Sequence, residues 1–294
     1  MNVTAVIAEY NPFHNGHLYQ LRTIREQGAD YIIIVMSGDF MQRGIPAIVS
    51  KYERCRMALS NGADLVFELP VYSALGSAEY FAQGAVSMLD KLGIVDVLHF
   101  GSESGDIALL TESAKIIAHE TTSYKASLNN YLRQGISFPA ARDKALSDSF
   151  SGRNTEQIIK MPNNILGMEY IKALIQRNSS IKPATLVRKG AGYSSNLLVS
   201  GSFVSANAIR TALSAQKDSE VREHMPDSVY EMLGQTLLFA NDFSELCLYK
   251  MLQLSANKES FAGYYDVGKQ LSHTLYSNLY HYTSFDGFAL KNKT

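Results

Sequence analysis

The sequence predicts an α/β fold in which a doubly wound parallel sheet is followed by a helical C-terminal segment. Short apolar runs alternate with amphipathic segments through residues 1–100, as expected where parallel strands are joined by crossover helices. Residues 31–36 read YIIIVM, a nearly continuous apolar run that is typical of a strand covered on both faces. Beyond residue 226 the apolar period is helical throughout, which indicates a boundary there.

The individual elements follow from the same patterns. We expect strands at residues 3–8, 31–36, 65–69, 95–100 and 184–187. We expect helices at residues 16–27, 48–60, 74–92, 165–176 and 206–215, with three more between residues 106 and 146. Residues 148–162 are polar and are predicted to form an exposed loop. The predicted domains are residues 1–225 and residues 226–294.

Composition bounds the kind of protein. The chain has 294 residues, of which 46% are apolar and 19% charged, so it can bury a core and is not disordered throughout. Lys and Arg number 27 against 28 Asp and Glu, which excludes a strongly basic coat for DNA but not a local basic patch. Cys55 and Cys247 have no metal-site spacing and indicate reduced thiols. The N-terminus lacks the charged start of a signal peptide, and no apolar stretch approaches the roughly 20 residues of a membrane span. We therefore expect a cytoplasmic protein with neither a membrane nor a DNA partner.

The strongest chemical signal follows the first expected strand, where residues 14–17 read HNGH. Gly16 allows backbone to approach a ligand closely, and His17 lies in the first turn of the expected helix, where amides and the dipole favour phosphate. His14 and His17, three residues apart, can hydrogen-bond phosphate oxygens and stabilise charge that develops during transfer at an α-phosphate. The alternative for each is an ordinary surface or core histidine. A metal site is disfavoured because no third ligand is nearby in sequence.

This element resembles the HxGH motif of the nucleotidyltransferase superfamily, whose ATP site is shared with class I aminoacyl-tRNA synthetases. Those proteins carry a second element late in the domain, a Ser-containing turn that opens a helix with an Arg downstream. Residues 204–210, reading VSANAIR, fit this pattern. Ser205 would cap the helix and Arg210 would cover the β- and γ-phosphates. Taken alone, Ser205 is an ordinary helix cap.

Five separated stretches of sequence narrow the resemblance from this superfamily to a single family. They are YNPFHNGHLY at residues 10–19, MSGDFMQRG at 36–44 with Pro46 and Ala47, FGSE at 100–103, PNNILG at 162–167 and RKGAGY at 188–193. Together they are similar to the bacterial tRNA(Met) cytidine acetate ligase family, and the similarity covers most of the chain. It implies a Rossmann-like nucleotidyltransferase fold, with residues 1–225 as the ATP-binding domain.

The resemblance also implies an activity and a site. Family members use ATP and acetate to form acetyl adenylate with release of pyrophosphate, then acetylate N4 of the wobble cytidine of elongator tRNA(Met). Mg²⁺ is expected to accompany ATP, and no metal-ligating residues are assigned. His14 and His17 are the expected catalytic residues. The expected ATP-binding residues are Ile7, Ala8, Glu9, Tyr10, Asn11, Pro12, Phe13, His14, Asn15, Gly16, His17, Leu18, Tyr19, Gln20, Gly101, Asn163, Arg188, Ser205 and Arg210.

Several of these residues have plainer interpretations. Gly101 would make room for adenosine, or be a simple turn glycine. Asn163 would offer its amide to a base or ribose, although capping of the helix from residue 165 is the better interpretation from sequence alone. Arg188 would bind phosphate or be a solvated surface residue. Arg43 would meet acetate, pyrophosphate or tRNA.

Three further acidic positions complete the candidate site residues considered from the sequence. Glu68 and Glu103 both follow expected strands, and capping or solvation is favoured for them over an indirect role in holding Mg²⁺. Asp39 stands where the resemblance leads us to expect Asn.

Two other functions remain open from the sequence. One is an adenylyl- or cytidylyltransferase that acts on a phosphorylated small molecule, and the other is a nucleotide-binding module without turnover. Residues 226–294 are expected to be truncated relative to the family. They carry more acidic than basic residues and no Arg, so we expect weaker tRNA binding than in a longer member.

Overall fold

The computed structural model describes residues 1–150, 159–188, 198–234, 236–257, 259–264 and 267–291. Five parallel strands form one sheet in the order β3-β2-β1-β4-β5. The strands are β1 (Val3–Ala8), β2 (Tyr31–Ser37), β3 (Leu65–Leu69), β4 (Val97–Ser102) and β5 (Lys182–Val187). The predicted doubly wound parallel sheet is confirmed, with β1 at its centre. Because the strands are parallel, all five carboxyl ends meet at one edge.

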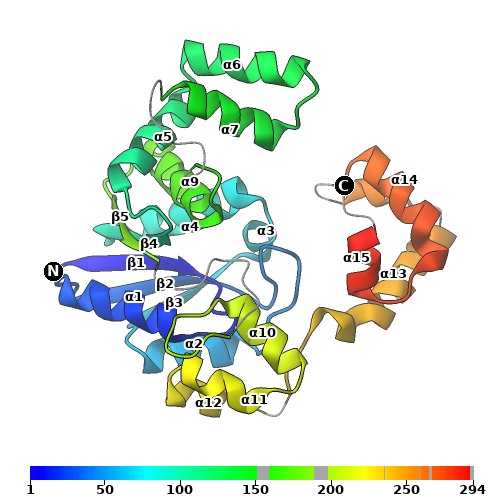
Figure 1. The fold of residues 1–294 in the computed structure, drawn as a ribbon, viewed down its shortest axis with the longest axis horizontal. Coiled ribbons are helices and arrows are strands. Elements are labelled where there is room, and N and C mark those ends of the chain that lie inside the picture. Colours follow the sequence, from blue (N-terminus) through cyan, green and yellow to red (C-terminus); the bar gives the residue numbers. More distant parts are fainter. Residues whose placement is uncertain (151–158, 189–197, 235, 258, 265–266, 292–294) are drawn as a thin grey trace. The chain divides into compact units, whose positions relative to one another are not determined.

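Helices cover both faces of the sheet (Figure 1). Helices α1 (Asn15–Glu26) and α2 (Lys51–Ser60) lie on one face, and α4 (Ala78–Leu92), α5 (Ile107–His119) and α9 (Pro162–Gln176) lie on the other. Among the described residues up to 236, the other helices are α3 (Val71–Ala74), α6 (Thr122–Arg133), α7 (Phe138–Asp148), α10 (Ala206–Ser214), α11 (Asp218–Val221), η1 (Arg222–His224) and α12 (Asp227–Met232).

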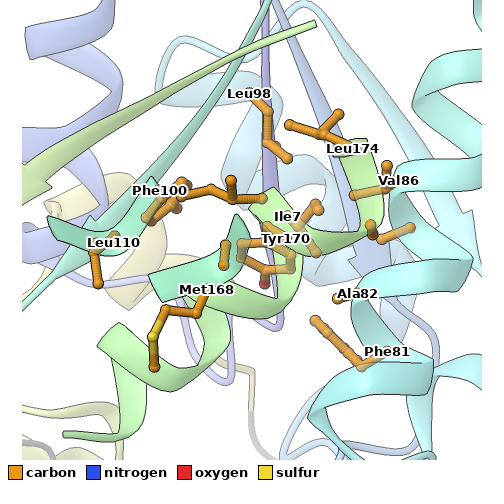
Figure 2. Close-up of a cluster of buried hydrophobic side chains, with 14 of the residues drawn as sticks. Ile7, Phe81, Ala82, Val86, Leu98, Phe100, Leu110, Met168, Tyr170 and Leu174 are labelled. Atoms are coloured by element: carbon orange, nitrogen blue, oxygen red, sulfur yellow. The ribbon is translucent and has the colours of Figure 1, made fainter. Parts of the chain in front are cut away.

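The main apolar core lies between the sheet and the second helical layer. Figure 2 shows Ile7 of β1 and Phe100 of β4 facing Phe81 of α4 and Tyr170 of α9. Each of these side chains is at most 9% exposed. Burial of one such side chain contributes about 1.5–3 kcal/mol, so this layer holds the carboxyl ends of β1 and β4 rigidly beside α9.

Several boundaries differ from the prediction for local physical reasons. The helix expected at 48–60 begins only at Lys51, because Ser50 caps it by accepting from the Glu53 amide. The helix expected at 74–92 begins only at Ala78, after the N-cap residue Ser77, while Ala74 ends the separate short helix α3. Helix α9 begins at Pro162 rather than at residue 165, as the fixed φ of Pro suits a first helical position.

The chain divides into two compact units, Met1–Thr236 and Leu237–Thr294. The second unit consists of η2 (Ala240–Phe243), α13 (Ser244–Ala256), η3 (Phe261–Gly263), α14 (Lys269–Asn278), η4 (Leu279–His281) and α15 (Phe285–Lys291). Its own small core includes Phe261, which stacks on Tyr276 with ring centroids 4.4 Å apart. No helix within the described residues combines the length and apolar character needed to cross a bilayer.

Candidate active site

A cavity of about 210 Å³ lies in the first unit and is built from segments that follow four of the five strands. Its wall comes from the loop after β1, the β2–α2 loop, the ends of β4 and β5, and the first turns of α1, α9 and α10. The lining residues are Ile7, Ala8, Glu9, Tyr10, Asn11, His14, Gly16, His17, Tyr19, Gln20, Met41, Gln42, Arg43, Ile45, Phe81, Phe100, Gly101, Asn163, Leu166, Tyr170, Leu186, Val187, Arg188, Phe203, Val204, Ser205, Ala206, Asn207 and Arg210.

The loop between β1 and α1 is held in place from both sides. Tyr10 adopts a left-handed backbone conformation with φ of 46°, which turns the chain sharply after the strand. The Oδ1 atom of Asn11 accepts from the Ile48 amide at 2.9 Å, and the Asn11 carbonyl accepts from Nη1 of Arg210 at 2.7 Å. The β2–α2 loop and α10 therefore clamp the same residue.

A buried arginine on α2 holds the start of the β1–α1 loop by hydrogen bonds to backbone carbonyls. The Arg54 side chain, on α2, is 0% exposed. Its Nη1 atom donates to the carbonyls of Glu9 at 2.7 Å and Ser37 at 3.0 Å, and its Nη2 atom donates to the Gly38 carbonyl. Burial lowers the pKa of Arg54 to about 10, against the opposing effect of nearby carboxylates. The guanidinium thus remains charged at neutral pH and ties the ends of β1 and β2 together.

His14 and His17 form a reciprocal cap at the start of α1. Nδ1 of His14 accepts from the Gly16 amide at 3.0 Å, and Nδ1 of His17 accepts from the His14 amide at 3.2 Å. The two rings stack with centroids 3.7 Å apart. A neutral imidazole whose Nδ1 accepts carries its proton on Nε2. Each histidine therefore keeps one N–H donor that the cap does not use.

Electrostatics keeps both rings neutral. Burial, with smaller contributions from Arg188, Arg210 and His224, lowers the pKa of His14 to about 3. Burial, followed by the effects of His14 and Arg188, holds the pKa of His17 well below its usual range. At neutral pH the pair can therefore donate hydrogen bonds without carrying positive charge, and the positive charge in the cavity wall comes from arginines.

The loop after β4 meets the first turn of α9. The Glu103 carboxylate accepts from the backbone amides of Asn163 at 3.2 Å and Asn164 at 2.9 Å. The capping interpretation of Glu103 is thereby confirmed. The interpretation of Asn163 as a helix cap is wrong, because the helix starts earlier and Met161 occupies that position. Glu68 lies within β3 and pairs with Lys51 at 2.8 Å.

Gly101 and Arg188 lie side by side in the cavity wall. A Cβ atom on Gly101 would lie 3.2 Å from Cγ of Arg188, so the glycine leaves room for this arginine at the end of β5. Arg188 is exposed rather than buried, yet its charge acts on both histidines. The residues that follow it, 189–193 of the RKGAGY stretch, lie outside the described part of the chain.

Helix α10 contributes the late element that the sequence predicts. Ser205 caps the helix, with its hydroxyl accepting from the Ala208 amide at 3.1 Å. Nη2 of Arg210 donates to Oδ1 of Asn207 at 3.1 Å. Ser205, Asn207 and Arg210 all line the cavity, so residues about 190 positions away in sequence face His14 across it.

The β2–α2 loop closes another part of the wall. The Gln42 amide donates to Oε1 of Glu9 at 2.8 Å, and Arg43 extends from the same turn. Asp39 accepts from the Lys51 amide at 3.0 Å and so helps to start α2. The predicted position of Arg43 beside the cavity agrees with this geometry.

Four residues of the expected 7–20 stretch do not line the cavity, namely Pro12, Phe13, Asn15 and Leu18. Phe13 is 0% exposed and packs against Tyr10 with centroids 4.9 Å apart. The Asn15 amide instead donates to the Glu223 carbonyl at 2.9 Å. These residues shape the loop without facing the cavity.

Several apolar lining residues that come from distant segments were not predicted from the sequence. These are Phe81, Tyr170, Leu186, Val187 and Phe203. Their sequence signal is only that of ordinary apolar positions, on helices and strands or, for Phe203, in a loop, so nothing in the sequence distinguishes them from other apolar residues. Asn207 had a clearer signal, since it stands one helical turn before Arg210.

One buried donor in the cavity wall lacks a partner, whereas the described residues offer no cluster of metal ligands. Nδ2 of Asn11 is buried and finds no hydrogen-bond partner among the described residues, which is common where a ligand supplies the partner. By contrast, no group of three or more His, Cys, Asp or Glu side chains gathers for a metal ion in the described ranges. Together with Arg188 and Arg210 in the same wall, the Asn11 amide favours an anionic, hydrogen-bonding ligand.

A central strand followed by a two-histidine helix cap and a distant Ser-capped helix with Arg defines the class of HxGH nucleotidyltransferases. Consistent with this, residues 1–294 match the HIGH Nucleotidyl Transferase family. Within that family, identity above 40% to enzymes named tRNA(Met) cytidine acetate ligase shows that the chain belongs with them.

Two relatives and two solved structures support this placement. The enzyme of that name from Caldicellulosiruptor saccharolyticus is 44% identical over 100% of this chain and 73% of its own length. The one from Clostridium novyi is 41% identical over 97% and 72%. Thermotoga maritima TmcAL is 36% identical, covers 100% of this chain, and superposes with a TM-score of 0.92 in its apo form and 0.89 with alpha-thio ATP bound. In both structures this chain covers 71% of the Thermotoga chain.

Proposed function

We propose that the chain is an ATP-dependent ligase that activates acetate and transfers the acetyl group to N4 of the wobble cytidine of elongator tRNA(Met). The observation that carries this proposal is identity above 40% to enzymes named tRNA(Met) cytidine acetate ligase along nearly the whole chain. The ATP analogue bound to the Thermotoga relative supports ATP as the nucleotide.

The first half-reaction needs alignment and charge stabilisation rather than a protein nucleophile. An acetate oxygen attacks the α-phosphorus of ATP, the bond from that phosphorus to the β-phosphate bridging oxygen breaks, and pyrophosphate leaves. Negative charge accumulates on phosphate oxygens during this step. The proposed catalytic residues, His14 and His17, would donate Nε2–H bonds to those oxygens from neutral rings.

The arginines would neutralise the triphosphate. Arg188 and Arg210 both line the cavity and both lower the pKa of His14, so their positive charges lie near the histidine pair. Because Arg210 is already oriented by Asn11 and Asn207, it would meet a phosphate with little further loss of conformational freedom. The Ser205 cap and the α10 amides lie beside it.

Mg²⁺ is proposed to enter with ATP. Among the cavity-lining residues Glu9 is the acidic one, and its carboxylate already accepts from the Gln42 amide. Protein groups would therefore supply few ligands, and phosphate oxygens and water would hold the ion. When bound, the ion would offset charge on the phosphates.

In the second half-reaction the cytidine N4 amine attacks the acetyl carbonyl carbon. The bond to the AMP oxygen breaks, AMP leaves, and the nitrogen loses a proton. We propose Arg43, which is exposed beside the cavity, as a contact for acetate or tRNA phosphate. A tRNA substrate places the reaction in the cytoplasm.

Exchange of labelled pyrophosphate into ATP tests the proposal. The ligase should show exchange that depends on acetate and needs no other acceptor. A transferase acting on a phosphorylated small molecule would require that molecule instead, and a binding module would show no exchange. Acetate-independent exchange or none at all, in a folded protein that binds ATP, would contradict the proposed activity.

A further inference from the structure

The side-chain amide of Asn163 lies between a hydrogen-bond acceptor and a donor. Its Nδ2 atom donates to Oε1 of Glu103 at 2.6 Å, and its Oδ1 atom accepts from Nη1 of Arg188 at 3.4 Å. A carboxylate can only accept and a guanidinium can only donate. Both neighbours therefore select the same one of the two possible amide orientations.

Glu103 is itself held firmly. Its carboxylate accepts from the backbone amides of Asn163 and Asn164, while Oδ1 of Asn164 accepts from the amides of Glu103 at 3.0 Å and Ser104 at 3.2 Å. These reciprocal bonds join the β4–α5 loop to the start of α9. Rotation of the carboxylate would break several of them at once, so it is a fixed acceptor.

Glu103 does not line the cavity, whereas Asn163, Arg188 and Gly101 do. Any effect of Glu103 on a ligand therefore passes through Asn163. The NH₂ group of Asn163 is bound to Glu103, so the amide oxygen points toward Arg188. Because Arg188 lines the cavity, the oxygen is the atom of this amide that can meet a ligand there.

We propose that Glu103 is a positioning residue that orients the Asn163 amide so that its oxygen accepts a hydrogen bond from the nucleoside of ATP. This inference rests on the proposed function, which supplies ATP as the ligand. The nucleoside has two kinds of donor, the N6 amine of adenine and the ribose hydroxyls. Guanine and hypoxanthine present a carbonyl oxygen where adenine has its amine, and an acceptor facing an acceptor is unfavourable.

Nucleotide selectivity measured by calorimetric titration tests the proposal. The ligands are ATP, ITP, 2′-deoxy-ATP and 3′-deoxy-ATP. In the wild-type chain the analogue that lacks the contacted donor should bind about tenfold more weakly than ATP, the usual effect of one lost hydrogen bond. The identity of that analogue shows which donor Asn163 contacts.

Glu103→Gln is the decisive variant. It supplies one oxygen and one NH₂ group where Glu103 has two acceptors, so the Asn163 Nδ2 donor and the helix amides compete for a single oxygen. Only the 3.4 Å contact from Arg188 then still selects the original amide orientation. We expect ATP to bind about tenfold more weakly and the discriminated analogue to bind as well as ATP. In an Asn163→Ala background, Glu103→Gln should change the selectivity no further.

Two further variants separate orientation from folding. Asn164→Ala loosens the same junction but leaves the Asn163 amide between Glu103 and Arg188, so it should lower the melting temperature and leave the selectivity ratio unchanged. Glu103→Asp keeps an acceptor-only side chain, so its ratio should survive even where affinity falls, and it serves if Glu103→Gln does not fold.

Three results would overturn the inference alone while ATP binding persists. They are a wild-type chain that discriminates against none of the analogues, a folded Glu103→Gln chain with the wild-type ratio, and equal loss of the ratio in Asn164→Ala or Glu103→Asp. A wild-type chain that binds no ATP would overturn the proposed function as well.

Discussion

His14 and His17 can each donate a hydrogen bond from Nε2 while neutral, because the turn that holds them uses only Nδ1 of each ring. The cap consumes both Nδ1 atoms, and burial keeps the second proton off each ring. The sequence places His14 and His17 at a strand–helix junction, but it does not show that they cap the helix reciprocally. The structure adds to the expected hydrogen-bonding role that each ring is neutral and keeps its Nε2–H outside the cap.

His17→Ala should lower acetate-dependent pyrophosphate exchange by about 10²–10³-fold, the usual cost of removing one transition-state donor. The folded state should lose about 1–3 kcal/mol, because the His14 amide loses its acceptor and the ring contacts with Tyr10 and His14 are lost. Exchange kinetics and urea unfolding measure the two effects. His119→Ala, an exposed position at the end of α5, is the control, and near-normal exchange in folded His17→Ala would refute the assignment.

His99 should make the fold sensitive to acid. It is 1% exposed in β4, and burial lowers its pKa from the ordinary value of 6.5 to about 4. Between pH 6.5 and about 4, His99 is therefore protonated in the unfolded chain but neutral in the folded chain. Stability attributable to this histidine is complete above pH 6.5 and decreases as the pH falls toward 4, by about 1.4 kcal/mol per pH unit.

His99→Gln should flatten that dependence by the same amount, about 1.4 kcal/mol per pH unit. Urea unfolding at pH 8, 6 and 5 measures it, and the value at pH 8 gives the cost of the substitution itself, since both proteins are then neutral at this position. Parallel curves for the two proteins between pH 6 and 5 would show that His99 already takes up its proton in the folded state.

At the scale of the elements, regular patterns were predictable and junctions were not. The five strands and most helices follow from apolar periodicity, so the sheet and its central β1 could be predicted. The loop before α2 is fixed by Asn11, whose Oδ1 atom accepts from the Ile48 amide 37 residues further along the chain, and no local pattern carries that information. The same holds for the bonds between Glu103 and α9, which only the folded sheet brings together.

Gly167 allows α9 to pack closely against β4. A Cβ atom there would lie 2.5 Å from Cε2 of Phe100. An Ala in a helix interior normally stabilises by about 1 kcal/mol relative to Gly, but Gly167→Ala should destabilise by about 1–3 kcal/mol because the core is overpacked. Gly263→Ala is the control, because the added carbon meets no atom within 4 Å there. Chemical denaturation should show a lower free energy of unfolding for Gly167→Ala and no loss for Gly263→Ala.

Arg54 connects α2 to the ends of β1 and β2, and Lys cannot reproduce its fork of donors. Arg54→Lys should lower the free energy of unfolding by about 2–3 kcal/mol, since buried carbonyls lose charged partners. It should also raise the KM for ATP, because the Glu9 carbonyl anchors the loop that carries His14. Arg56→Lys, two residues along and exposed in its pair with Glu53, should change neither, and equal behaviour of the two variants would refute the role of Arg54.

At the scale of the whole molecule, the cavity belongs to one unit. Every lining residue lies between Ile7 and Arg210, within Met1–Thr236, and that unit contains the entire main core cluster. The long-range half of the site, Ser205 to Arg210, was predictable only through its pairing with the HNGH turn. The apolar wall of the cavity was not predictable, because a residue such as Tyr170 has the same sequence pattern as any core residue of α9.

A chain of residues 1–236 should therefore fold and bind ATP with a Kd within about threefold of the 294-residue chain, a difference below 1 kcal/mol. The reason is that the fragment retains the sheet, both helical layers and all cavity-lining residues. Calorimetric titration with ATP and acetate-dependent pyrophosphate exchange measure binding and activation separately. Thermal unfolding with and without ATP shows whether the fragment is folded. A folded fragment that binds ATP more than tenfold more weakly would show that residues 237–294 contribute to the nucleotide site.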